Sequence, residues 1–349
     1  MQGKDTSLLT NLDLTRELLR QIGSPFVDVK ESLSNRSSPA KLHQYSVKNR
    51  MSYLYLQTAD SLGIKEMHTL FEKDDVRRSI IDEAITKAST VLTDAGIDHV
   101  LFKTIRPYPS TTVDIDTLIM NAASYEKSID SMRKSGYTLV ARGPKSTTMW
   151  DEKADIGIDL YEEIAVSYTV YLDKQTLAHF KTSRQMTNDR KVRMLKPEAD
   201  LVCIIAHSVI KEQMYTLAEY FSYIHYLKHL DVSDFVRIIE ENHITNAAKT
   251  HTAITAMLHR VAHQSVPKQL SKIITSIGKE DLEISRIAKS GYETPHKYHP
   301  ITIARSLTEI MKGTKSRNSI ASQLIHMLSP QISQDFLRKL TNHFLRETY

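Results

Sequence analysis

The most informative part of this sequence is Val113-Asp-Ile-Asp-Thr-Leu-Ile119, which predicts a strand that carries two acids. Apolar and acidic residues alternate at its start, and successive side chains of a β-strand point to opposite faces of a sheet. Asp114 and Asp116 are therefore expected on one face, with apolar neighbours turned to a core. Two carboxylates this close repel each other unless cations lie beside them. The spacing favours a divalent cation site, although such a pair is also typical of a solvated strand face.

A third acid lies in a second strand-like stretch, Ile156-Gly-Ile-Asp-Leu-Tyr-Glu162. Asp159 has apolar neighbours on both sides, which would anchor this strand in the core and turn the carboxylate to the other face. If the strand pairs beside Val113–Ile119, then Asp114, Asp116 and Asp159 converge. Converging carboxylates are the hard oxygen ligands that suit Mg²⁺, with Mn²⁺ as an alternative. Such a site could hold two metal ions for phosphoryl or nucleotidyl transfer.

The residues around these acids predict a small mixed sheet. Short apolar or alternating runs follow Gly96 and are separated by Gly143-Pro144 or by charged turns. The expected elements are strands at Ile97–Phe102 and Val113–Ile119, a helix at Ala122–Lys134, and strands at Tyr137–Ala141, Ser146–Trp150 and Ile156–Ile164. This order is typical of a small α/β sheet domain.

Helical periodicity flanks the sheet on both sides. The expected N-terminal helices are Leu14–Ile22, Met51–Leu62 and Asp74–Gly96, with a loop over Ser34–Lys41. The expected C-terminal helices begin at Pro197 and continue at Leu217–Leu230, Ser233–Asn242, Ala247–Gln264, Pro267–Ile277, Ile301–Met311 and Ser319–His343, with the clearest break at Gly291–Pro300. The fold class is therefore predicted to be α+β. We expect a helical N-terminal segment over 1–95, a sheet domain over 96–195 and a helical C-terminal domain over 196–349.

Composition narrows the class of protein. Of the 349 residues, 41% are hydrophobic and 25% are charged, which is ordinary for a globular protein. Ten glycines and ten prolines are too few for a turn-rich all-β or collagen-like chain. The single cysteine, Cys203, excludes a disulfide framework and a cysteine-based zinc site. No signal-peptide pattern or run of roughly 20 apolar residues is present. We therefore expect a soluble, cytoplasmic protein without a membrane partner.

The net charge of +5 is unevenly distributed. Residues 251–349 contain 14 Lys and Arg against 7 Asp and Glu, whereas residues 1–250 contain 32 against 34. A basic C-terminal region suggests an acidic partner, of which RNA is the obvious candidate. A lysine-rich solvated helical surface is the alternative, because no dense basic run with interleaved aromatic residues appears.

Several motifs follow one another in a recognisable order: Gly96-Ile-x-x-Val-Leu-Phe-Lys103, a loop, the paired acids, a helix, Gly136-Tyr137 and Ile-Asp159-Leu. Over roughly residues 80–230 this order resembles the nucleotidyltransferase superfamily with the DNA-polymerase-β fold, in particular toxin-type members of the AbiEii/MenA-like group. The resemblance implies that Asp114 and Asp116 bind two Mg²⁺ ions and a nucleoside triphosphate. It also implies that Asp159 is a third ligand or activates the acceptor. The implied reaction transfers a nucleoside monophosphate to a hydroxyl of RNA, tRNA or a protein.

One position departs from the resemblance. Family members usually have a glycine with a serine or second glycine, or a Lys-Gly pair, after the first strand, where Lys103-Thr104 stands here. A side chain there is expected to crowd the phosphate cradle. An arginine frequent just before the paired acids is also absent, and Arg106 is the nearest substitute. The alternative function is therefore a catalytically inactive module that binds a nucleotide, RNA or a partner protein.

The remaining candidates for nucleotide binding are polar residues near these motifs. Lys103 could contribute charge to a phosphate, and the hydroxyls of the loop could donate hydrogen bonds. His207 and Lys211 are four residues apart and so share one helix face, although a histidine in a satisfied core position is an equal alternative. The predicted nucleotide-binding set is Lys103, Thr104, Ser110, Thr111, Thr112, His207 and Lys211.

Overall fold

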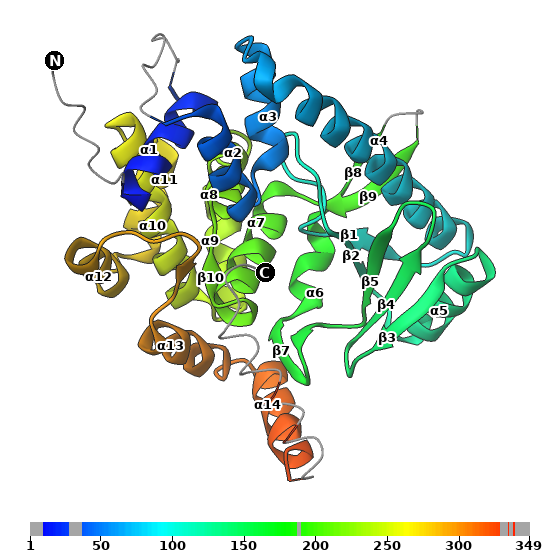
Figure 1. The fold of residues 1–349 in the computed structure, drawn as a ribbon. Helices are drawn as coiled ribbons and strands as arrows, with labels where there is room; N and C mark the ends of the chain where they lie inside the picture. Colours follow the sequence, from blue (N-terminus) through cyan, green and yellow to red (C-terminus); the bar gives the residue numbers. More distant parts are fainter. Residues whose placement is uncertain (1–9, 28–36, 187–189, 329–333, 335–337, 339–349) are drawn as a thin grey trace, which may run out of the picture.

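The computed structural model describes residues 10–27, 37–186 and 190–328, together with residues 334 and 338. A seven-stranded mixed sheet lies among helices (Figure 1), so the predicted α+β class is confirmed. The strand order across the sheet is β3 (Thr138–Arg142), β4 (Ser146–Asp151), β5 (Ile156–Tyr161), β2 (Asp114–Ile119), β1 (His99–Leu101), β9 (Lys191–Leu195) and β8 (Lys181–Gln185).

Strand β2 is central and carries the paired acids. It runs antiparallel to β1 and parallel to β5, and Asp116 is the register partner of Asp159. Ile115 packs in the apolar cluster with α4 (Lys65–Asp94) and α5 (Tyr125–Lys134), whereas Leu118 packs in the cluster that contains α7 (Pro197–Ala206). Because side chains alternate along a strand, the acids of β2 face the α7 side.

The N-terminal region forms three shorter helices before α4, namely α1 (Asn11–Ile22), α2 (Pro39–Lys48) and α3 (Ser52–Ser61). The predicted loop over Ser34–Lys41 is wrong at its end, because α2 begins at Pro39. The Ser38 side chain accepts a hydrogen bond from the Lys41 amide, and proline is favourable in a first helical turn. Residues 34–36 of that prediction lie outside the described residues.

The limits of two other predicted elements are corrected. Helix α4 begins at Lys65, whereas the prediction placed its start at Asp74. Its first turns are largely exposed and carry little apolar periodicity, so the sequence pattern did not indicate them. The expected strand Ile156–Ile164 is divided into β5 and a separate strand, β6 (Ile164–Val166). Strand β6 forms a hairpin with β7 (Thr169–Leu172), which is followed by the short helix α6 (Lys174–Leu177).

The C-terminal half is helical as predicted, with additional elements. A π-helical turn over His207–Lys211 extends α7, and the strands β10 (Met214–Tyr215) and β11 (His296–Lys297) pair with each other. The helices are α8 (Leu217–Tyr226), α9 (Val232–Glu241), α10 (Thr245–His263), α11 (Lys268–Ile277), α12 (Leu282–Ser290), α13 (Pro300–Ile310) and α14 (Thr314–His326). The predicted last helix, Ser319–His343, starts five residues after the observed start of α14 at Thr314. Most of its predicted C-terminal part lies outside the described residues.

One apolar cluster joins elements from the whole chain. It contains Leu18 of α1, Phe102 after β1, Leu201 of α7 and Ile254 of α10. The N-terminal helices therefore pack against the C-terminal helices beside the sheet (Figure 1).

The predicted boundaries of the N-terminal segment, the sheet domain and the C-terminal domain, at 1–95, 96–195 and 196–349, stay predictions. No helix in the described part of the chain is both long enough and apolar enough to cross a bilayer.

Candidate functional site

The three predicted acids meet on the α7 face of the sheet. Asp114, Asp116 and Asp159 each offer a ligand atom, and these atoms lie within 4.8 Å of one another. The parallel pairing of β2 and β5 creates this arrangement, because it sets Asp116 beside Asp159. The Thr148 hydroxyl on β4 donates a 2.6 Å hydrogen bond to Asp159 Oδ1. Asp116 Oδ1 is buried and has no hydrogen-bond partner among the described residues.

The electrostatics of the triad favour a bound cation. The charge of Asp116, followed by burial, raises the pKa of Asp114 to about 6. Burial is the main cause that raises the pKa of Asp159, and the hydrogen bond from Thr148 opposes it. Raised pKa values mean that the ionised carboxylates are disfavoured where they stand. A cation among them would remove that penalty.

Lys103 occupies the position at which the resemblance leads one to expect a glycine. Its φ of +60° lies in the left-handed region, which glycine adopts at low cost. Its amide donates a 2.7 Å hydrogen bond to Asp200 Oδ1 on α7, which holds this conformation in place. The chain therefore keeps a backbone turn suited to glycine while carrying a lysine side chain. Sequence reasoning missed Asp200, because an acid in the first turn of a helix is usually no more than a favourable charge near the helix start.

The Lys103 side chain turns back onto the triad. Its ammonium lies 3.1 Å from Asp116 Oδ2, and both side chains are buried. The same ammonium lies 3.1 Å from His207 Nδ1, and His207 Nε2 lies 3.3 Å from Glu212 Oε1. Burial, followed by the charge of Lys103, lowers the pKa of His207, so the ring is neutral. An ammonium has no acceptor, so Nδ1 accepts and Nε2 donates toward Glu212.

The predicted hydroxyl residues are placed differently from one another. Thr104 is buried, and its Oγ1 accepts a 2.8 Å hydrogen bond from the Asp116 amide, so this side chain fixes β2 rather than lining the pocket of the acids. Thr112 lines that pocket, and its hydroxyl donates to the Asp114 carbonyl at 2.8 Å. Ser110 and Thr111 line neighbouring pockets instead.

A pocket with several cations contains two of the acids. Besides Asp114 and Asp116, its lining includes the predicted residues Lys103, Thr112, His207 and Lys211, and also Arg50, Arg106, Glu212 and Glu219. Sequence reasoning missed Arg50, which lies between α2 and α3 with a φ of +59°. A single arginine between helical patterns gives no local signal of such a role. Its left-handed backbone is a type of strain found at functional sites.

Lys211 lies on the Asp159 side of the same pocket. Its ammonium donates a 3.4 Å hydrogen bond to the Tyr161 hydroxyl and lies 5.8 Å from the centre of the Tyr161 ring. The π-helical turn places Lys211 and His207 along one wall, and π-helical turns are frequent at functional sites. The structure thus gathers three acids that could hold a metal ion and several cationic side chains in one place.

Comparison with known proteins leaves the family open. No model of a known protein family matches this chain, and no curated protein is significantly similar to it in sequence. The function is therefore argued from the site itself.

Proposed function

We propose that this protein is a metal-dependent nucleotidyltransferase of the DNA-polymerase-β type. It moves a nucleoside monophosphate from a nucleoside triphosphate to a hydroxyl acceptor. The observation that carries the proposal is the triad Asp114, Asp116 and Asp159, whose ligand atoms lie within 4.8 Å of one another on two adjacent strands. The cations of the adjoining pocket complement a triphosphate.

The acids fit a divalent metal ion. The donor set consists of hard carboxylate oxygens, and the buried Asp116 Oδ1 has no partner among the described residues. Mg²⁺ is bound in proteins by one or two carboxylates together with substrate phosphates, and we propose it as the cofactor, with Mn²⁺ as the alternative. Asp114, Asp116 and Asp159 would hold it. When bound, the ion would offset the charge that develops on the phosphates.

The side chains of the pocket account for the remaining steps. Lys103, Lys211 and Arg50 would bind the triphosphate and reduce its charge repulsion with the acids. Asp159, held by Thr148, would accept the proton of the acceptor hydroxyl. The hydroxyl oxygen then forms a bond to the α-phosphorus, while the bond from that phosphorus to the pyrophosphate breaks.

The acceptor is proposed to be RNA or tRNA, with a protein hydroxyl as the alternative. This choice rests on the basic excess of residues 251–349, in which 14 basic residues stand against 7 acidic ones.

A label-transfer assay tests the proposal. The full-length protein is incubated with each of four α-labelled nucleoside triphosphates and Mg²⁺, with and without total RNA. We expect label on RNA or on the protein itself for the wild type and none for Asp116→Asn. Asp130→Asn, an exposed acid on α5, is the matched control and should behave as wild type. Absence of transfer with every nucleotide, or equal transfer by Asp116→Asn, would contradict the proposal.

The ion pair between Lys103 and Asp116 supports a second candidate, an inactive nucleotide-binding module. A lysine 3.1 Å from Asp116 Oδ2 already neutralises part of the acidic charge without a metal. This candidate predicts nucleotide binding that is unchanged by EDTA and is not followed by transfer. The enzyme predicts binding that weakens on EDTA addition.

A further inference from the structure

A second charged pocket adjoins the pocket of the acids. It lies between α4, the loop after β1 and the edge strand β8, and we call it the arginine pocket. Three guanidinium groups line it, and Asp82 is the single acid among the described residues of its lining. Its defining residues are Arg78, Asp82, Arg106, Ser110, Thr112 and Arg184.

The three arginines come from separate parts of the chain. Arg78 of α4 donates a 3.0 Å hydrogen bond to the Tyr53 hydroxyl and lies over the Tyr53 ring. Arg106 donates a 2.9 Å hydrogen bond to the Ser222 hydroxyl, which anchors the loop to α8. Among the described residues the Arg184 side chain makes one hydrogen bond, a long one of 3.5 Å to the Arg106 carbonyl. Tertiary packing therefore gathers positive charge that no stretch of sequence contains.

The lining of the arginine pocket is better matched by a phosphate of a ligand than by a carboxylate of the protein. Three guanidinium groups against one carboxylate leave the lining with an excess of positive charge. Planar guanidinium groups bind phosphate oxygens through two parallel hydrogen bonds, and Ser110 adds a hydroxyl donor. The negative charge of Asp82 is partly neutralised within the pocket, because Arg78 Nε lies 4.0 Å from Asp82 Oδ2.

The arginine pocket is a neighbour of the pocket of the acids. Arg106 and Thr112, both in the loop between β1 and β2, line both pockets. The acids face the α7 side of the sheet, whereas Arg184 pairs with Val192 and faces the α4 side. A nucleotide held at the acids would therefore reach the arginine pocket with its terminal phosphates by passing along this loop.

We propose that the arginine pocket binds the pyrophosphate end of the nucleotide and then the pyrophosphate released from it. This inference rests on the proposed function for its place in the reaction, and it assigns Arg78, Arg106 and Arg184 as ligands of the terminal phosphates. The pocket supplies charge without using the carboxylates, so binding of pyrophosphate there does not need a metal ion.

Titration with inorganic pyrophosphate in the presence of EDTA tests the assignment, with calorimetry as the measurement. Arg184→Gln should weaken binding by about tenfold or more, because it removes charge-assisted hydrogen bonds. Arg193→Gln is the matched control on the neighbouring strand β9. Arg184 pairs with Val192, which packs on the α4 side, so Arg193 points to the opposite face of the sheet. The control should bind as the wild type does.

Two further arms separate the possible failures. Asp116→Asn should lose label transfer yet bind pyrophosphate in EDTA as the wild type does. This arm separates a failure of the pocket assignment from a failure of the proposed function. If the wild type transfers label while Arg184→Gln and wild type bind pyrophosphate equally, the pocket assignment is wrong and the function stands. A short RNA whose binding depends on Arg184, with no pyrophosphate binding in any variant, would assign the pocket to the acceptor instead and overturn the proposal.

Discussion

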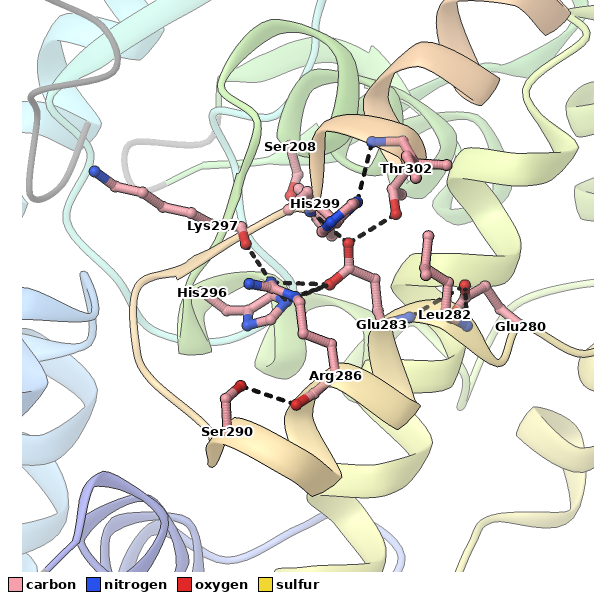
Figure 2. A network of polar contacts seen from close by, with 12 residues as sticks. Ser208, Glu280, Leu282, Glu283, Arg286, Ser290, His296, Lys297, His299 and Thr302 are labelled. Carbon is pink, nitrogen blue, oxygen red and sulfur yellow. Dashed lines mark hydrogen bonds and ion pairs between the residues drawn. The ribbon is translucent and has the colours of Figure 1, made fainter.

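Glu283 on α12 is buried among hydrogen-bond donors, whereas the acidic triad is buried among like charges. Glu283 accepts hydrogen bonds from the Thr302 hydroxyl at 2.7 Å, the His299 amide at 2.5 Å, Arg286 Nε at 3.0 Å and His296 at 3.1 Å (Figure 2). These contacts join α12 to the segment around β11 and to the start of α13. Every lone pair that burial removes from water is given a donor.

The pKa values of the two regions shift in opposite directions. Burial raises the pKa of Glu283, but hydrogen bonds from His296, the His299 amide and Thr302 outweigh it and lower the pKa to about 2. The charge of Asp116 raises the pKa of Asp114 to about 6. Glu283 is thus stabilised by donors of its own protein, whereas the charges of Asp114 and Asp116 repel each other even though the Lys103 ammonium lies beside Asp116. A carboxyl pKa that is raised by a neighbouring charge and by burial, as at Asp114, is typical of functional sites.

The largest effect is expected at Asp159. Asp159→Asn removes the group that accepts the proton, so kcat should fall by about 10²–10⁴-fold. Asp114 and Asp116 remain, so the affinity for the metal–nucleotide complex should change much less than kcat. Single-turnover label transfer and equilibrium nucleotide binding measure the two quantities. An unchanged kcat would remove Asp159 from the chemistry.

Glu283→Gln should show the reverse behaviour. The variant loses a charged acceptor from a buried network and should be destabilised by about 2–4 kcal/mol. Its label transfer, measured well below its unfolding midpoint, should match the wild type because α12 does not line the pocket of the acids. Urea unfolding gives the free energy. A variant as stable as wild type would show that the network is not what holds α12.

The two regions should respond to pH with opposite sign. The pKa of Glu283 is lowered from 4.5 to about 2, so its stabilisation is present above about pH 4.5 and is lost as the pH falls toward 2. The pKa of Asp114 is raised from 3.8 to about 6, so its ionisation costs stability above pH 6 and nothing below about pH 4.

Asp114→Asn tests this difference without metal. The variant should be more stable than wild type by about 1–2 kcal/mol at pH 7, because a carboxylate that ionises against its neighbours is gone. The gain should vanish near pH 4, where Asp114 is protonated in the wild type. Unfolding in urea with EDTA, followed across pH 4 to 7, measures it. A loss of stability at pH 7 would contradict the electrostatic argument.

An effect of similarly small size is expected at His207. Its Nδ1 accepts from the Lys103 ammonium, so His207→Ala leaves that ammonium with one fewer partner. The affinity for the nucleoside triphosphate should fall by roughly tenfold, about 1.4 kcal/mol. His207→Gln offers an amide oxygen in the same region and should recover part of the loss. Equal affinities in all three proteins would mean that His207 does not position Lys103.

The local parts of the site were predictable because local rules create them. The alternation in Val113–Ile119 places Asp114 and Asp116 on one face whatever packs around them. The predicted helix start at Pro197 is confirmed for α7, because proline and acidic residues are favourable in a first helical turn. Strand β8 was not predicted, because Lys181–Gln185 is polar throughout and exposed, so it lacks the apolar alternation of a half-buried strand.

The sequence by itself determined an α+β chain with three acids in two strands, since strand alternation and helix capping act within a few residues. The tertiary structure alone decided that β5 lies beside β2, that Lys103 turns onto Asp116, and that Arg50 reaches the site from between α2 and α3. Tertiary structure alone also brings Arg78, Arg106 and Arg184 together. Strand pairing and helix docking join residues far apart in the chain, and the burial of shared apolar surface fixes them.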